Sequence, residues 1–300
     1  MSEPVPLEAT RLGKRYRTTW ALRDCSFRLP AGRVAALVGP NGSGKTTLLQ
    51  LAAGLISPTV GTMAAFGSRP DDPRGSALPE VAFLAQDQPL YRSFTVNDLL
   101  RYGRHTNPRW DDRVARRRLE SLGIPLDRKA GSLSGGQQTE VALAVCLSKH
   151  AGLLLLDEPV SRLDPLARHQ FFATLMDAVA AEQTTVMLSS HVLADLEKIC
   201  DFVIILSASR VQIAQDIDDL VATHRVLVGA RLDPPRPPAT GNVVHASHSD
   251  RQTTLLVRDP AAILDPRWDV HQPSLEEIVV AYLKDPAAGQ PQPLQAVAAP

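Results

Sequence analysis

Short apolar runs alternate with longer amphipathic stretches over most of the chain. The runs at 34–38, 81–85, 151–156, 184–190 and 202–206 are rich in Val, Leu, Ile and Ala, so they predict buried strands. Stretches such as 164–182 place apolar residues at helical spacing and predict amphipathic helices between the strands. Strands and helices that alternate in this way predict an α/β fold with a mostly parallel sheet, covered on both faces.

The pattern differs in three parts of the chain. Short strands at 7–10, 21–23 and 25–29, separated by turns, predict an antiparallel β subdomain before the first buried strand. Residues 87–150 predict helices at 95–102, 111–122 and 133–149, and we interpret the arginine run at 116–118 as a solvated helix face. Strands at 225–228, 243–246 and 253–257, a proline-rich break at 231–238 and a helix at 275–283 predict a small α+β unit.

These changes divide the chain into three parts. Residues 1–222 form the main α/β domain, which contains a helical subdomain at about 87–150. Residues 223–284 form a small C-terminal α+β domain. Residues 285–300 are rich in Pro, Ala and Gln, and this composition predicts a disordered tail.

Composition narrows the classes of function. The net charge of the 300 residues is zero, so bulk electrostatics do not favour nucleic-acid binding. The three cysteines lack metal-ligand spacing, and we expect buried free thiols in a reducing compartment. No signal peptide and no apolar run of membrane-spanning length is evident. We therefore expect a protein that is soluble by itself and reaches a membrane only through a partner.

The main candidate for chemistry is a glycine-rich loop between the strand at 34–38 and the helix that follows. The loop reads Gly39-Pro40-Asn41-Gly42-Ser43-Gly44-Lys45-Thr46-Thr47 and matches G-x-x-x-x-G-K-[ST]. Its glycines let successive N–H groups point at a phosphate, and the helix N-terminus adds its positive dipole. Lys45 supplies a cation for the β- and γ-phosphates, and the Thr46 hydroxyl can bind Mg²⁺. The alternative is a chance glycine turn.

Polar residues also follow three other predicted strands. Gln86 follows the strand at 81–85, Asp157 and Glu158 follow the strand at 151–156, and His191 follows the strand at 184–190. Ligands bind beyond the carboxyl ends of parallel strands, so we expect these residues to converge on one nucleotide. Asp157 can hold Mg²⁺ directly or through water, Glu158 can accept a proton from an attacking water, and His191 can contact the γ-phosphate. By themselves, carboxylates at a strand tip can simply mark a turn.

A second glycine-containing helix start identifies the family that the chain resembles. The predicted helix at 133–149 begins with Ser134-Gly135-Gly136-Gln137, which makes a second anion-binding helix N-terminus in the chain. One nucleotide does not need two such phosphate-binding sites from the same subunit. This stretch resembles the signature motif of the ATP-binding cassette (ABC) ATPases. Residues 39–47 resemble their Walker A motif, 153–158 their Walker B motif and 161–164 their D-loop. Gln86 resembles the Q-loop glutamine and His191 the switch histidine, and Tyr16 stands where an aromatic residue stacks on adenine, with Trp20 as a rival.

The resemblance covers about residues 7–220 and implies a P-loop NTPase fold with a helical signature subdomain. It assigns ATP binding to Tyr16, residues 39–47 and Ser134 to Gln137, and Mg²⁺ binding to Thr46, Gln86 and Asp157. It assigns catalysis to Lys45, Gln86, Glu158 and His191. It also implies a head-to-tail dimer, in which residues 39–47 of one subunit and the signature of a second ATPase subunit enclose each ATP, and in which hydrolysis releases the dimer. Because the motifs are complete, a homodimer is favoured.

The family also implies partners and a location. The transporter ATPases of the family act with a membrane permease, here expected on a separate chain that holds the substrate, and they lie on the cytoplasmic face of the cell membrane. The segment 87–104 is expected to meet the permease. The sequence Ser274-Leu275-Glu276-Glu277 resembles prokaryotic exporter ATPases, including the drug- and antibiotic-export type. An importer ATPase, a soluble ABC ATPase acting on ribosomes or DNA, and a P-loop kinase or switch GTPase are the alternatives.

Two residues depart from the family pattern. Glu140 stands shortly after the signature, where the family usually has a basic residue, and Arg162 stands at a D-loop position that is commonly small. Neither change removes a catalytic group, but both bear on how the dimer closes.

Overall fold

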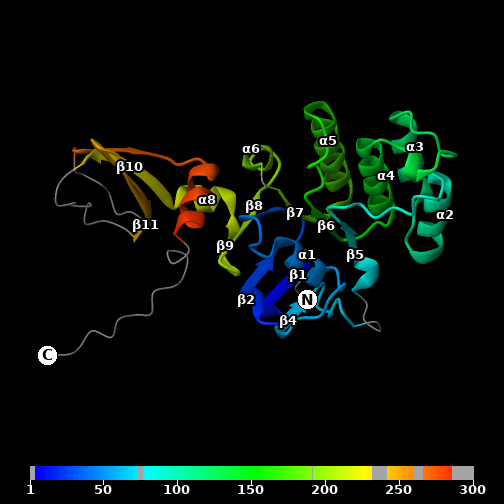
Figure 1. Cartoon of the computed structure of the whole chain (residues 1–300), viewed down its shortest axis with the longest axis horizontal. Coiled ribbons are helices and arrows are strands. Elements are labelled where there is room, and N and C mark those ends of the chain that lie inside the picture. Colours follow the sequence, from blue (N-terminus) through cyan, green and yellow to red (C-terminus); the bar gives the residue numbers. More distant parts are fainter. Residues whose placement is uncertain (1–3, 73–76, 191, 232–241, 260–265, 286–300) are drawn as a thin grey trace.

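The computed structural model describes residues 4–72, 77–190, 192–231, 242–259 and 266–285. Figure 1 shows an elongated molecule with a C-terminal sheet at one end and helices α2 (Val96–Thr106), α3 (Asp112–Ser121) and α4 (Gly135–Ser148) at the other. The central sheet lies between these two ends. No helix within the described residues is long and apolar enough to span a membrane.

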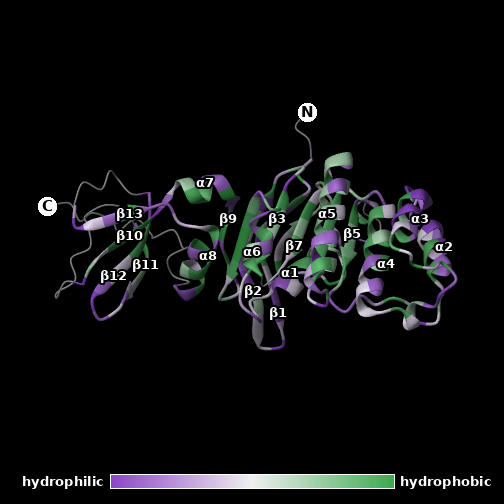
Figure 2. Ribbon diagram, turned by 90° about the horizontal axis from the view of Figure 1, so that it is seen from above, coloured by the Kyte–Doolittle hydropathy of each residue, from purple (hydrophilic) through white to green (hydrophobic). Residues whose placement is uncertain are grey.

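The central sheet confirms the predicted α/β fold. It has six strands in the order β5 (Val81–Leu84), β6 (Leu153–Asp157), β7 (Thr185–Ser189), β3 (Val34–Val38), β8 (Phe202–Ser207) and β9 (Arg210–Asp216). The first five strands are parallel, and β9 pairs antiparallel with β8. The pattern did not predict β9, because this edge strand mixes polar residues with half-buried apolar ones. Figure 2 shows β3 and β7 as apolar strands in the middle of the molecule.

Layers on both faces bury the sheet. Helix α1 (Lys45–Ala52) packs on one face, together with an antiparallel sheet of β2 (Thr19–Leu29), β1 (Leu7–Tyr16) and β4 (Val60–Ala64). Helices α5 (Pro165–Glu182) and α6 (Leu193–Leu196) cover the other face. The prediction of two short strands within β2 was wrong. The strand runs through Asp24, whose φ of 54° accompanies an irregularity in its pairing with β1, as a β-bulge does.

Helices α2, α3 and α4 have an apolar core of their own. Its buried residues include Val96, Leu100, Leu119, Ile124 and Val141. Two 3₁₀ turns, η1 (Leu78–Glu80) and η2 (Ala130–Ser132), precede β5 and α4, respectively. The interpretation of the arginine run as a solvated face was wrong for Arg118. Helix α3 packs against α4, and the Arg118 guanidinium donates to Glu140 Oε2 at 2.7 and 3.2 Å.

This ion pair explains one departure from the family pattern. The side chain of Arg118 is 16% exposed and that of Glu140 is 9% exposed. Because each charge is compensated by the other, the acidic residue after the signature is accommodated inside the helical part of the chain. The pattern missed the pair because the two residues lie on different helices.

The C-terminal part contains a four-stranded antiparallel sheet. Its order is β11 (Asn242–His248), β12 (Gln252–Arg258), β10 (His224–Ala230) and β13 (Trp268–His271), and α7 (Ile217–Ala222) precedes it. Helix α8 (Leu275–Lys284) then packs against β8, and its Ile278 and Val279 join the apolar core that contains Val203 and Ile205. The chain therefore returns to the central sheet after the C-terminal strands. The predicted tail at 285–300, apart from its first residue, and most of the proline-rich break lie outside the described residues.

Candidate functional site

Four segments that are separated in the sequence line one cavity at the carboxyl end of the central sheet. The cavity has a volume of about 410 Å³. Its lining residues come from β2, the glycine-rich loop and α1, and the segments after β5 and at the end of β6: Ala21, Asn41, Gly42, Gly44, Lys45, Thr46, Thr47, Gln86, Asp157 and Glu158. The convergence of the glycine-rich loop with two strand ends follows from the parallel order of the strands.

The glycine-rich loop is packed so closely that its shape depends on glycine. Gly44 has a φ of 108° directly before α1, and a Cβ atom there would collide with the carbonyl oxygen of Ala21. A Cβ atom on Gly39 would collide with the carbonyl oxygen of Leu206 at the end of β8. The loop is therefore held between β2 and β8, and only glycine fits at both positions.

Lys45 is the buried cation of the loop. Its side chain is directed back onto the loop, where Nζ donates to the carbonyl oxygens of Gly39 at 2.7 Å and Pro40 at 3.3 Å. Burial lowers the pKa of Lys45, and the nearby carboxylates of Glu158 and Asp157 oppose that shift. A bound anion would therefore stabilise the charged ammonium, because the protein compensates this charge only in part.

The loop also offers unused hydrogen-bonding groups for a phosphate. Ser43 Oγ is buried and has no hydrogen-bond partner among the described residues. The Cβ direction of Gly42, whose φ is 79°, faces open space. Helix α1 begins at this loop, with Gly44 as its N-cap and no side-chain cap. These features fit the phosphates of a nucleotide, which N–H groups at a helix N-terminus bind well.

The acidic side of the cavity is organised by a serine that the sequence analysis did not single out. Ser189 is fully buried at the end of β7. Its Oγ donates to Asp157 Oδ1 at 2.7 Å and accepts from the Glu158 N–H at 2.9 Å. Glu158 has a φ of 46°, so its backbone is held in a left-handed conformation. In the sequence, the signal for this role was that Ser189 lies at the end of a strand. That strand, β7, pairs with β6, which carries the carboxylates at its end.

Oxygen donors for Mg²⁺ lie in the same cavity. Thr46, Gln86 and Asp157 all line it, and Mg²⁺ is held by a few protein oxygens together with phosphate oxygens and water. The described residues contain no cluster of three or more His, Cys, Asp or Glu that could hold a metal ion. A cation held by these oxygen donors would also be bound by the oxygens of a bound nucleotide.

Several predicted site residues are not among the residues that line this cavity. Ser134 to Gln137 form the N-terminus of α4, where the Ser134 and Gln137 side chains cap each other's backbone N–H groups. Tyr16 is 47% exposed at the end of β1, and the ammonium of Lys14 lies 5.5 Å from its ring centroid. Neither Tyr16 nor its rival Trp20 is among the lining residues. His191 lies outside the described residues. These assignments remain predictions.

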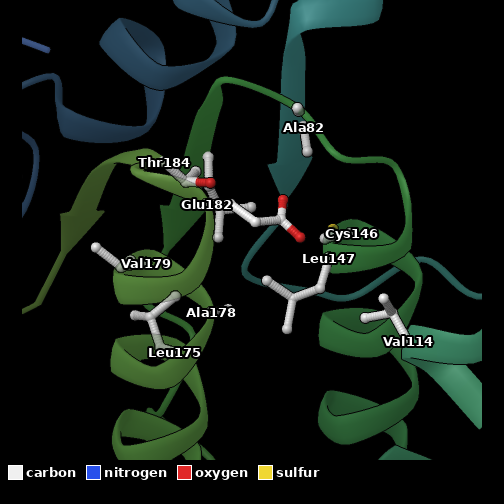
Figure 3. A pocket seen from close by; sticks show the side chains of 11 residues that line it. Ala82, Val114, Cys146, Leu147, Leu175, Ala178, Val179, Glu182 and Thr184 are labelled. Carbon is white, nitrogen blue, oxygen red and sulfur yellow. The ribbon is translucent and has the colours of Figure 1, made fainter. Parts of the chain in front are cut away.

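A second, smaller cavity lies between α4 and α5. Its volume is about 30 Å³, which suits about one water molecule. Figure 3 shows that mostly apolar side chains line it and that Glu182 reaches towards Cys146 and Leu147 of α4. Cys146 is partly buried, and the desolvation of its thiol raises the pKa of that thiol to about 12, so it is not a nucleophile. This cavity cannot hold a nucleotide.

The comparisons with known proteins agree with the geometry of the larger cavity. Residues 22–161 match the family model described as ABC transporter. This match, together with a relative of 33% identity that covers about two thirds of both chains, shows that the chain belongs to the ABC ATPase family, whose members bind and hydrolyse ATP, and that it is an ATP-binding subunit of the transporter type.

Named relatives act in both directions of transport. The chain is 33% identical over 219 residues to the "Nod factor export ATP-binding protein I" of Rhizobium leguminosarum bv. viciae, covering 69% of this chain and 68% of the relative. It is 31% identical over 255 residues to the "Aliphatic sulfonates import ATP-binding protein SsuB" of Shigella flexneri serotype 5b, covering 84% and 96%. A solved "Structure of ATP binding subunit of ABC transporter" matches with a TM-score of 0.66 and 27% identity, over 72% and 92% of the two chains.

Proposed function

We propose that this chain binds ATP with Mg²⁺ and works as a head-to-tail dimer, whose closure on ATP moves substrate through a separate membrane permease. The observation that carries the proposal is the incomplete lining of the cavity. Lys45, Gln86 and Glu158 line it, whereas Ser134 and Gly135 open a helix elsewhere on the same chain. A second subunit that supplied its α4 N-terminus would complete the enclosure of the nucleotide.

Each lining residue has a role that follows from its chemistry. Lys45 would leave the carbonyl oxygens of its own loop and bind the β- and γ-phosphates. Glu158 would take the proton of the attacking water, held in place by the bond from its N–H to Ser189. Gln86 and His191 would orient that water and the γ-phosphate. A bound Mg²⁺ would neutralise charge that develops on the phosphate oxygens.

An exposed aromatic group supports contact between the segment after Gln86 and the permease. Tyr91 is 56% exposed and Tyr102 is 50% exposed, and their ring centroids are 5.9 Å apart. The ring of Phe94 lies 5.1 Å from that of Tyr91. Exposed aromatic side chains that gather in one place are typical of protein interfaces. Contact with a permease would hold the chain at the cytoplasmic face of the membrane.

Export is the direction that we propose. A relative from Cupriavidus pinatubonensis, also named "Nod factor export ATP-binding protein I", aligns over 87% of this chain at 30% identity, which extends the similarity into the C-terminal part. The sulfonate import relative supports the opposite direction. Transport assays in inside-out and right-side-out vesicles that contain the ATPase and its permease separate the two directions.

The experiment that tests the dimer is Glu158→Gln. Without the carboxylate, hydrolysis should stop while ATP binding persists, so ATP with Mg²⁺ should convert the monomer into a dimer on size-exclusion chromatography. Glu120→Gln, at an exposed position of α3, is the matched control and should hydrolyse ATP like the unmodified chain. A Glu158→Gln variant that binds ATP but stays monomeric at saturating ATP and Mg²⁺ would contradict the proposed dimer.

A further inference from the structure

Residues 92–129, which contain α2 and α3 at one end of the molecule (Figure 1), carry an excess of positive charge. They include ten Lys and Arg against five Asp and Glu, a net charge of +5 in a chain whose net charge is zero. Two of the carboxylates are compensated locally, because Asp111 pairs with Arg113 at 3.2 Å and Asp112 pairs with Arg116 at 3.5 Å. The surplus therefore rests on the remaining cations.

Five of these cations are exposed and form no ion pair within the described part of the chain: Arg92, Arg101, Arg104, Arg128 and Lys129. We call these five residues the basic face. Among the nearby carboxylates, that of Asp98 is engaged in the capping box at the start of α2, and that of Asp127 is exposed beside Arg128. The basic face keeps a positive charge with both carboxylates present.

Backbone contacts bring the three segments of the basic face together. The Val96 N–H donates to the carbonyl oxygen of Arg128 at 3.0 Å, and the Gly131 N–H donates to the carbonyl oxygen of Arg92 at 3.0 Å. Arg101 lies on the exposed side of α2, about 8 Å along the helix axis from Val96 at a rise of about 1.5 Å per residue. Residues from three parts of the sequence therefore share one region of the surface.

Exposed tyrosines lie in the same region. The rings of Tyr91 and Tyr102 have centroids 5.9 Å apart, and these residues are the chain neighbours of Arg92 and Arg101. Tyrosine is enriched where membranes meet water, because its ring is apolar and its hydroxyl is polar. None of the five cations lines the nucleotide cavity or the smaller cavity between α4 and α5. Cations that are spread out in this way suit an extended anionic surface better than a single anion.

We propose that the basic face binds the anionic headgroups of phospholipids at the surface of a bilayer, in addition to the permease contact proposed above. The negative potential of such a surface strengthens binding about fivefold for each Lys or Arg that comes close to it. This contact orients the end of the molecule that carries α2 towards the membrane. It requires neither ATP nor the dimer, so it can be tested independently of the proposed function.

The test measures co-sedimentation of the full chain, without a permease, with vesicles of equal parts phosphatidylglycerol and phosphatidylcholine. The chain should bind these vesicles and should bind poorly to vesicles of phosphatidylcholine alone. The triple variant Arg101→Gln, Arg104→Gln and Arg128→Gln should bind about 100-fold more weakly, since each cation contributes about fivefold. Raising the salt concentration from about 0.1 M to 1 M shortens the Debye length from about 10 Å to about 3 Å and should release the unmodified chain.

A control variant removes the same charge elsewhere. Arg23→Gln, Lys198→Gln and Arg251→Gln change exposed residues that form no ion pair within the described residues, so this variant should bind within about threefold of the unmodified chain. Both triple variants should keep the thermal unfolding midpoint, because they change only exposed side chains. Equal weakening of both variants, or equal binding to vesicles of phosphatidylcholine alone, would overturn the proposal. A variant of the basic face that loses the permease but still binds the anionic vesicles would assign this face to a protein partner and would also overturn it.

Discussion

Ser189 forms hydrogen bonds with both acidic residues of the cavity, with the carboxylate of Asp157 and the backbone N–H of Glu158, and Ser189→Ala is a direct test of the site geometry. The substitution removes a donor to Asp157 Oδ1 at 2.7 Å and an acceptor for the Glu158 N–H at 2.9 Å. Apart from this one oxygen atom, alanine keeps the size and shape of the serine side chain. Both carboxylate-bearing residues therefore lose a support that is fully buried.

The expected magnitude follows from these two hydrogen bonds. A bond to a charged carboxylate contributes about 1.5–3 kcal/mol and a neutral bond about 1 kcal/mol. We expect Ser189→Ala to lower the free energy of unfolding by about 2–4 kcal/mol, since both remaining partners stay buried. A residue that orients a metal ligand typically changes metal affinity or activity by about 10–100-fold. The Mg²⁺ concentration for half-maximal ATP hydrolysis should rise within that range.

The assay is the rate of phosphate release as Mg²⁺ is varied at saturating ATP, with urea denaturation in parallel. Ser207→Ala is the matched control, because Ser207 is similarly buried at the end of β8, which lies two strands away from β7 in the same sheet. A Ser189→Ala variant whose Mg²⁺ dependence and maximal rate both stay within about twofold of the unmodified chain would refute the assigned role, even if its stability fell.

Two further predictions concern groups outside the cavity. Arg118→Met leaves the 9% exposed Glu140 side chain without its partner, so the free energy of unfolding measured by urea denaturation should fall by about 3–5 kcal/mol. The double variant Arg118→Met with Glu140→Met should recover most of this loss. Arg117→Met, at an exposed position of the same helix, is the control, and an equal loss of stability there would contradict the reasoning. Burial, with Arg258 nearby, lowers the pKa of His224 below its ordinary 6.5, so below about pH 6.5 the unfolded chain binds the proton more readily and stability should fall as the pH is lowered. Urea midpoints at pH 7.5 and 5.5 should differ less for His224→Gln than for the unmodified chain. An equal difference would show that His224 is not the cause of the loss of stability at low pH.

Local patterns were enough to predict the parts of the site that lie close together in the sequence. The glycine-rich loop, Lys45 and the helix after them follow from one short motif between a strand and a helix. The carboxylates at 157 and 158 follow from the end of an apolar run. Their convergence with Gln86 was also predictable, because parallel strands bring their carboxyl ends to one edge of a sheet.

Features that depend on a second segment were missed. Ser189 has its role only because β7 pairs with β6. The burial of Arg118 depends on the packing of α3 against α4, so the arginine run looked like a solvated surface. Strand β2 appeared as two pieces because its irregular pairing with β1 around Asp24 interrupts the pattern. Each of these three features depends on a contact with a segment that lies far away in the sequence.

The sequence by itself predicted most of the strands and helices and a set of candidate site residues, because hydrophobic period, glycine and helix starts act over a few positions in the chain. The tertiary structure decided which of those residues share a cavity. It brought Lys45, Gln86 and Asp157 together and placed the signature on a different helix, because strand order and helix packing fix distances between segments that the sequence leaves open.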